Sequence, residues 1–287
     1  MNKKLFSFIN ILLLATLLIS CSNSKSNKKT GSDTKLGDKK ISIHDLVSLS
    51  ERCQYPFING FYNAIKYNGK VYFYLETTKQ ITEFDGNKIK AVNTGSSDYK
   101  ATFNNPVIHN DKLYFSGNNK EHEFGIYVYD GVEIKKVSSE GTDYYAYFDL
   151  PVSFKGNLYF RGENYSEMGM GTKKVYVIEN DVLKEVNSGT SGYNSYYSYP
   201  TVFNDNLYFE GSDASYTFGP YFISDLSTGI QSFTPSVTSD YVGGMVNPTI
   251  LQSNMVFIGT NGSTWGLYSY DGLDVQKWSG HQQEGNQ

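Results

Sequence analysis

Aromatic and apolar positions recur along this chain at a fixed spacing and are separated by short polar turns. In the clearest copy, Tyr144 is followed after seven residues by Pro151 and after seven more by the triplet Leu158-Tyr159-Phe160. Further copies, the first of them less regular, start at Phe57, Tyr99, Tyr193 and Tyr241. The triplets start at residues 71, 113, 158, 207 and 255, so successive copies are 42, 45, 49 and 48 residues apart. A period of this size indicates a protein built from repeats.

Each copy predicts four short β-strands. In the second copy we expect them at residues 106–109, 112–116, 125–129 and 132–137. The pairs Asn110-Asp111 and Asp130-Gly131 tolerate a positive φ and therefore favour tight hairpins. Four antiparallel strands in about 40–50 residues match the size of a β-propeller blade, and stacking such sheets around an axis buries faces that a single sheet leaves open.

The copies also resemble a bacterial repeat that runs N-G-K-L-Y-F, a Gly-containing loop and E-L-W-x-x-D-G-T. The matching pieces are Asn68-Gly69-Lys70-Val71-Tyr72-Phe73, Tyr127-Val128-Tyr129-Asp130-Gly131 and Leu267-Tyr268-Ser269-Tyr270-Asp271-Gly272. Tyr or Phe replaces the Trp of that signature, and the Thr after Asp-Gly is missing. The resemblance covers about residues 57–280 and implies a β-propeller-like domain, but it implies little about a ligand.

We therefore expect an all-β, β-propeller-like domain of about five four-stranded blades, with six blades as the alternative. Residues 41–50 precede the first copy, where they can close the ring against the last blade or belong to a further blade. An open stack is the less favoured arrangement, because neither end of the repeat array carries a polar capping unit.

The N-terminus has a different pattern. Two lysines precede an apolar run over residues 5–19, and the run closes with Leu18-Ile19-Ser20-Cys21. This pattern is typical of a secretory signal peptide and is too short for a membrane-spanning helix. Its end resembles the lipobox of bacterial lipoproteins, which implies cleavage before Cys21 and acylation of that residue. An ordinary signal peptide that happens to end in Cys is the alternative.

The chain thus divides into four predicted parts. They are a signal peptide (1–20), a lipidated Cys21 with a flexible tether (21–40), the repeat domain (41–280) and a disordered tail (281–287). We expect the protein in the bacterial cell envelope, lipid-anchored and extracytoplasmic, at the outer membrane or the cell surface. Residues 41–287 hold 17 basic and 27 acidic side chains, a formal charge of −10, which argues against nucleic acid as a partner.

No motif in the sequence carries recognisable chemistry. With Cys21 lipidated, Cys53 is left alone, and we read it as a buried thiol. Glu121-His122-Glu123 lies in a polar stretch with no second cluster, and we read it as a solvated loop. Gly262-Ser263-Thr264-Trp265 is similar to the end of the sialidase Asp-box, but Thr260 occupies the Asp position, which excludes a sialidase. The sequence therefore predicts no enzyme, no metal and no cofactor.

Antiparallel order predicts that the two hairpins of each copy lie on one face of the domain. Variable loops at residues 75–80, 117–124, 162–173, 211–219 and 259–266 then share the other face with the crossovers that carry the repeated tyrosines. Packing between blades would also require one Tyr per copy, whereas the clusters near Tyr144 and Tyr193 offer additional rings. The candidate binding residues are Tyr99, Tyr144, Tyr145, Tyr147, Tyr193, Tyr196, Tyr197 and Tyr241.

The sequence favours a non-catalytic binding or scaffold module for protein or glycan, displayed on a rigid scaffold. The alternatives are a propeller hydrolase that acts on carbohydrate and a component of an envelope assembly.

Overall fold

The computed structural model describes residues 63–75, 79–85, 89–139, 144–164, 172–237 and 240–278. These residues form five β-sheets, each built on four antiparallel strands, and contain no helix. The expectation of an all-β domain with five four-stranded units is therefore confirmed. The predictions for the signal peptide, Cys21, the tether, Cys53 and the tail lie outside the described residues, as do residues 41–50.

Each sheet contains a meander of four strands that follow one another in space as they do in sequence. The first sheet contains β1 (Ile65–Tyr67), β2 (Lys70–Leu75), β3 (Gln80–Phe84) and β4 (Ile89–Ala91). The second contains β5 (Tyr99–His109), β6 (Lys112–Asn119), β7 (Phe124–Tyr129) and β8 (Ile134–Lys136). The third contains β10 (Tyr144–Phe154), β11 (Asn157–Asn164), β12 (Thr172–Glu179) and β13 (Val182–Glu185).

The last two sheets follow the same plan. The fourth contains β14 (Tyr193–Phe203), β15 (Asn206–Asp213), β16 (Phe218–Ile223) and β17 (Ile230–Ser232). The fifth contains β19 (Gly243–Leu251), β20 (Asn254–Thr260), β21 (Trp265–Tyr270) and β22 (Asp274–Lys277). Two short strands, β9 (Ser138–Ser139) and β18 (Ser236–Val237), pair in parallel with β13 and β22. At these two sheets the chain passes along the outer edge before it enters the first strand.

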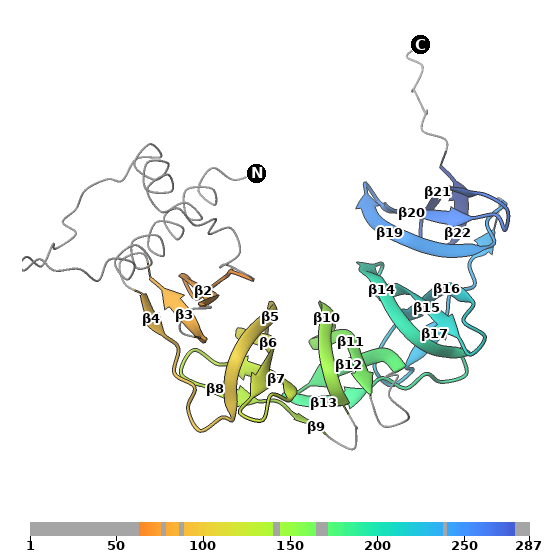
Figure 1. Ribbon diagram of the computed structural model, residues 1–287. Helices are drawn as coiled ribbons and strands as arrows, with labels where there is room; N and C mark the ends of the chain where they lie inside the picture. The colour runs from red at the N-terminus through yellow and green to blue at the C-terminus, as the bar shows by residue number, and fades with distance from the viewer. Residues whose placement is uncertain are drawn as a thin grey trace, which may run out of the picture.

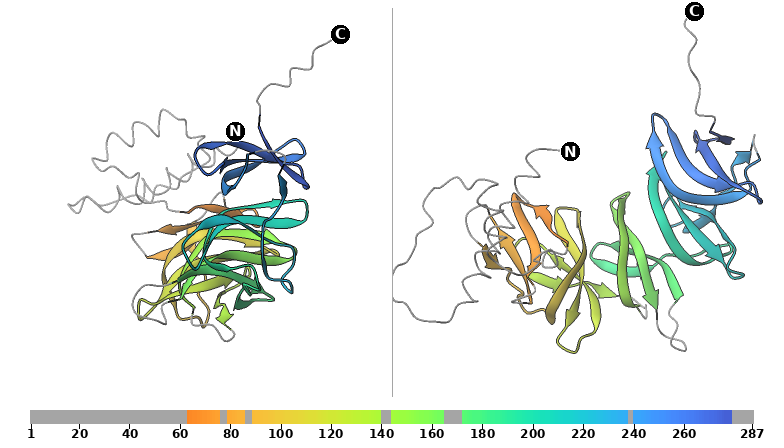
Figure 2. Two further views of the ribbon diagram at one scale, coloured as in Figure 1. Left: turned by 90° about the vertical axis from the view of Figure 1, so that its right-hand side faces the viewer. Right: turned by 45° about the horizontal axis from the view of Figure 1, so that its top comes forward.

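The five sheets lie side by side along an arc (Figures 1 and 2). The first strands β5, β10, β14 and β19 lie on its concave side, and the last strands lie farther out (Figure 1). Over the described residues the arc is open between the first and the last sheet (Figure 1). This differs from the closed ring that we expected, and the segment that we expected to close it lies outside the described residues.

The core lies between consecutive sheets, and the repeated triplet explains how it forms. In the third sheet, Leu158 and Phe160 pack in the cluster shared with the second sheet. Tyr159, which points to the opposite face of the strand, packs in the cluster shared with the fourth sheet. Because side chains alternate along a strand and both faces are covered, an unbroken apolar triplet is required at this position.

The first strands of the last four sheets begin earlier than the expected Pro: β5, β10 and β14 begin at the repeated Tyr, and β19 begins two residues after it. Each of these four strands is interrupted by register shifts. The shifts coincide with two left-handed residues, three and six positions after the Tyr. These residues are Thr102 and Asn105, Tyr147 and Leu150, Tyr196 and Tyr199, and Gly244 and Asn247. Left-handed non-glycine residues are uncommon, so their recurrence at two fixed positions defines a double bulge specific to this repeat.

The repeated Tyr stabilises this bulge. The hydroxyls of Tyr99, Tyr193 and Tyr241 donate to the carbonyl three residues later, at 2.6, 2.7 and 2.9 Å. A Gly on the second strand provides the space for each ring. A Cβ at Gly117 or Gly211 would lie 2.7 and 2.9 Å from the facing Tyr ring, closer than real Cβ contacts. The Tyr of the first strand and the Gly of the second strand therefore pack together and hold the two strands against each other.

Candidate functional site

The structure assigns four of the eight candidate tyrosines to the core. Tyr99, Tyr193, Tyr241 and Tyr197 are all buried. The first three hold the double bulges, and their rings meet Phe115, Phe209 and Phe257 of the second strands at 5.6–5.9 Å. Their burial corrects the expectation that they are presented for binding. Packing between strands accounts for the repeated Tyr in these three copies, because each ring fills the space above a Gly.

Tyr197 differs from the other three buried tyrosines in the environment of its hydroxyl. Its side chain is fully buried beside Phe209, with the ring centroids 5.0 Å apart. Its hydroxyl has no hydrogen-bond partner within the described part of the chain. Burial accordingly raises the pKa of Tyr197 well above its ordinary value. A buried hydroxyl without a partner is unfavourable by about 1–3 kcal/mol.

Replacing Tyr197 with Phe should therefore stabilise the fold. The expected result is an increase of about 1 kcal/mol in the free energy of unfolding, because the ring remains and the unpaired hydroxyl is removed. Urea denaturation of both proteins measures the difference. A loss of stability in the Phe variant would show that the hydroxyl contributes a favourable interaction.

The other candidates lie at the start of β10 and β14. The backbone of Tyr144 and Tyr145 begins β10, and their side chains lie outside the described residues. Tyr147 is exposed and left-handed, and the Lys173 ammonium lies 5.9 Å from its ring centroid. Tyr196, at the equivalent position of β14, packs on Phe218 with the ring centroids 5.0 Å apart. These two left-handed tyrosines remain as candidate binding residues.

Tyr147 and Tyr196 belong to a row of aromatic side chains at one end of the sheets. We call this end, where the second strand of each sheet passes to the third, the loop edge. The opposite end, with the two hairpins, is the hairpin edge. Trp265 completes the row above Gly244, where an added Cβ would lie 3.0 Å from the indole. The exposed fractions are 44% for Phe124, 47% for Tyr147, 51% for Phe218, 63% for Trp265 and 68% for Tyr216.

The loops between second and third strands are shorter than we expected from the sequence. Strands extend into the predicted loops, so that four residues connect β6 to β7, β15 to β16 and β20 to β21. Length variation is thus absent from these three connections. What distinguishes the loop edge is its aromatic side chains, three of which, Phe124, Phe218 and Trp265, start third strands at equivalent positions.

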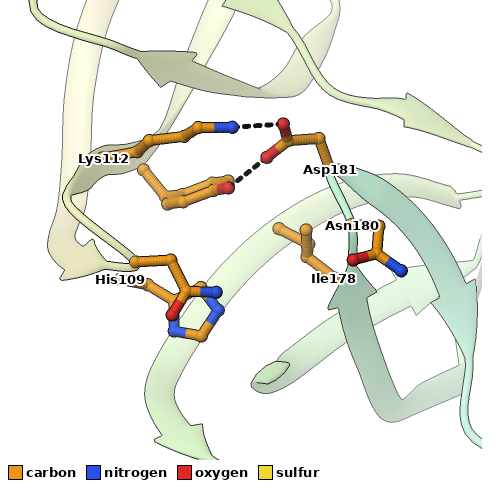
Figure 3. A pocket seen from close by; sticks show the side chains of 7 residues that line it. His109, Lys112, Ile178, Asn180 and Asp181 are labelled. Carbon is orange, nitrogen blue, oxygen red and sulfur yellow. Dashed lines mark hydrogen bonds and ion pairs between the residues drawn. The ribbon is translucent and has the colours of Figure 1, made fainter. Parts of the chain in front are cut away.

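A pocket lies at the hairpin edge, between the second and third sheets. It has a volume of about 280 Å³ and is lined by His109, Asn110, Lys112, Tyr114, Ile178, Asn180 and Asp181. We call it the His109 pocket. Lys112 forms an ion pair with Asp181, and the Tyr114 hydroxyl donates to the other oxygen of the same carboxylate (Figure 3). Nδ1 of His109 lies 2.9 Å from Oγ of Ser153.

The environment sets the charges in this pocket. Burial lowers the pKa of His109 and outweighs the opposing effects of the Gly156 carbonyl and Asp181. For Asp181, burial favours the protonated acid, but Lys112 and Tyr114 outweigh it and lower the pKa of the carboxyl. Burial and the neighbouring carboxylate raise the pKa of Tyr114. At neutral pH the pocket therefore holds one ammonium, one carboxylate and uncharged His and Tyr side chains.

The described residues contain no group of three or more His, Cys, Asp or Glu placed to hold a metal ion. In the same part of the chain we find no helix long and apolar enough to cross a membrane.

No family model and no curated protein matches this chain. Among solved structures it is similar to the β-propeller domain of the Trilobed protease from Pyrococcus furiosus, with 11% identity, coverage of 76% of this chain and 70% of that one, and a TM-score of 0.43. A puromycin-hydrolyzing peptidase from Mycobacterium tuberculosis has 14% identity over 76% of this chain and 38% of its own, with a TM-score of 0.45. An oligogalacturonate lyase has 11% identity over 73% and 61%, with a TM-score of 0.44.

The sequence-based prediction that the chain is not an enzyme is contradicted by this comparison. Its similar structures include a peptidase and a lyase. The lack of a familiar motif in the sequence gives no ground for a non-catalytic assignment. A site assembled from several repeats, such as the His109 pocket, has no contiguous motif to detect.

Proposed function

We propose that this chain is a lipid-anchored protein of the bacterial cell envelope whose propeller-like domain binds a polypeptide partner at its loop edge. The observation that carries the proposal is the row of exposed aromatic side chains there. Three of them, Phe124, Phe218 and Trp265, start the third strands of their sheets and so occupy equivalent positions. The anchor follows from the lipobox resemblance at Cys21.

Several features favour a polypeptide as the partner. Protein interfaces are enriched in Tyr, Trp and Phe and depleted of Lys, Glu and Asp. Aromatic side chains also supply a large contact area while losing few rotamers on binding. Packing of Tyr196 on Phe218 restricts both rings before a partner arrives, which lowers the entropic cost of binding.

An alanine set tests the loop edge. The combined variant Phe124→Ala, Phe218→Ala and Trp265→Ala should lose partner binding by at least tenfold, because exposed aromatic anchors dominate such interfaces. The matched control is Val132→Ala with Leu273→Ala, which removes exposed apolar side chains from the hairpin edge. Cross-linking in intact cells, followed by quantitative affinity purification, compares recovery of the partner polypeptide.

Two results would contradict the proposal. One is equal recovery of partner polypeptides with the loop-edge variant and with wild type. The other is a loop-edge variant that no longer binds soluble glycans from a panel but still recovers every polypeptide partner. That result would identify a glycan as the ligand of the loop edge.

The anchor has its own test. Cys21→Ala should abolish acylation and release the protein from the membrane fraction or block its processing, because stable anchoring depends on the acyl chains. Membrane fractionation with mass spectrometry of the N-terminus measures both. A processed Cys21→Ala protein that stays with the membranes would contradict the lipobox interpretation.

A further inference from the structure

The His109 pocket lies where two other interfaces of the repeat hold a pair of aromatic rings. Between the first and second sheets, the rings of Tyr67 and Tyr129 fill it, with centroids 6.3 Å apart. Between the fourth and fifth sheets, Phe203 and Tyr270 do the same at 5.9 Å. At the second interface His109 takes the place of the first ring, and Ile178 takes the place of the second. The third interface has Ile223 at the position of Ile178 but keeps a ring, Phe154, at the position of His109. At the His109 pocket, a more polar and a smaller side chain therefore replace both rings.

We propose that the His109 pocket binds a neutral polyhydroxylated ligand, with the chemistry of a single sugar unit. This site lies at the hairpin edge and is independent of the polypeptide surface proposed at the loop edge.

The charge balance excludes strongly charged ligands. An anion that approached Lys112 would meet the carboxylate of Asp181, and a cation that approached Asp181 would meet the ammonium. Each ion would also have to break a contact that holds the second sheet against the third. A neutral ligand meets no like charge and breaks no contact, because it can form hydrogen bonds with Lys112 and Asp181 while their ion pair persists.

The hydrogen-bonding capacity that remains is of mixed type. An ammonium has three donors and a carboxylate about four acceptor positions, so Lys112 and Asp181 keep capacity after bonding to each other. The amide of Asn110 donates to the Gly156 carbonyl at 3.1 Å and keeps its oxygen. Asn180 adds a further amide donor and acceptor to the lining. Hydroxyl groups, which donate and accept at once, match such an array, and the Tyr114 ring provides an apolar wall.

Size and access agree with one small ligand. The volume of about 280 Å³ lies at the lower limit of ligand pockets. The side chains of Lys112 and Asp181 are 35% and 43% exposed, so the polar groups can be reached from solvent. A free monosaccharide and the terminal unit of a glycan share this chemistry.

The test uses the intact domain and a panel of neutral hexoses, the matching uronic acids and amino sugars, and short oligosaccharides with the same terminal unit. Isothermal titration calorimetry measures affinity, and NMR shifts of the His109 ring report the site. A neutral hexose should bind at least tenfold more tightly than its charged counterparts. Tighter binding of the oligosaccharide would identify a glycan end, and equal binding a free sugar; both outcomes support the proposal.

Two variants make the test specific. Ile178→Tyr restores the ring present at Tyr129 and Tyr270 and should weaken binding at least tenfold. Asn180→Gly removes an amide but keeps the left-handed turn conformation, which Gly adopts readily, and should weaken binding severalfold. Asp205→Gly, a left-handed turn residue outside the pocket, is the control with unchanged affinity. Circular dichroism verifies that each variant folds. Absence of hexose binding to wild type, or unchanged affinity in both pocket variants, would overturn the proposal.

Discussion

Replacing Phe209 with Ala is expected to lower the free energy of unfolding by about 3–5 kcal/mol. Phe209 is fully buried on β15 and packs against Tyr193 and Tyr221 of its own sheet, with ring centroids 5.9 and 6.1 Å apart. It belongs to the cluster that joins the third sheet to the fourth. Truncation removes both the burial of the ring and the contacts around it, leaving a cavity that rigid sheets cannot close.

Denaturation in urea, followed by two probes, measures this effect. Both tryptophans, Trp265 and Trp278, lie in or directly after the fifth sheet, so fluorescence reports that end of the arc. Far-ultraviolet circular dichroism reports all five sheets. The matched control is Leu273→Ala, which is 77% exposed and should change stability by about 0.5 kcal/mol or less. A loss below about 1 kcal/mol for Phe209→Ala would contradict a core placed between the sheets.

Glu83→Gln is expected to lower stability at pH 7 by about 1–3 kcal/mol. Glu83 on β3 is buried and accepts from Lys70 at 3.1 Å, Lys90 at 2.8 Å and the Tyr72 hydroxyl at 3.1 Å. Lys70 and Lys90 both reach solvent, so the loss stays below the 3–5 kcal/mol typical of breaking a fully buried ion pair.

The stability difference between wild type and Glu83→Gln should depend on pH. Burial favours the protonated acid, but the hydrogen bonds from Lys90, Lys70 and Tyr72 outweigh it and lower the pKa of Glu83. The unfolded chain has the ordinary value near 4.3. The carboxylate therefore contributes stability above that pH, and the contribution is lost as the pH falls through the lower folded value. Unfolding curves between pH 7 and pH 3 should show the two proteins converging in acid; a constant difference would contradict the assignment.

The repeat pattern predicted the sheets because its signals are local. A triplet such as Leu158-Tyr159-Phe160 fits a strand buried on both faces, and pairs such as Asp130-Gly131 close hairpins. The start of the first strands was not predictable in the same way. The double bulge depends on left-handed residues such as Leu150 and Tyr199, which precede Pro and have no sequence preference for that conformation.

The binding residues were harder to place. The repeated Tyr suggested an exposed ring, but Tyr99, Tyr193 and Tyr241 are packed against a Gly of the adjacent strand. The exposed aromatics did leave a signal: an aromatic-Gly pair starts the third strand at Phe124, Phe218 and Trp265. These residues lie in stretches that looked like variable loops.

The His109 pocket joins residues from separate repeats. Lys112 and Asp181 are 69 positions apart in the chain, and their contact follows only from the stacking of two sheets. Alignment of the copies with one another marks His109 as unusual, because it occupies the position of Tyr67, Phe154 and Phe203. That His109 lines a pocket could be recognised only from the structure, which places Ile178 of the third sheet beside it.

The claim that the loop edge is the partner-binding surface can be tested most directly by site-specific photo-cross-linking in intact cells. A photoreactive amino acid is placed at Phe218 on the loop edge or, as the matched site, at Leu273 on the hairpin edge; both positions are exposed. We expect position 218 to form a cross-link to a discrete polypeptide and position 273 to form none. Cross-links to the same polypeptide from position 273 alone, or equally from both positions, would contradict it.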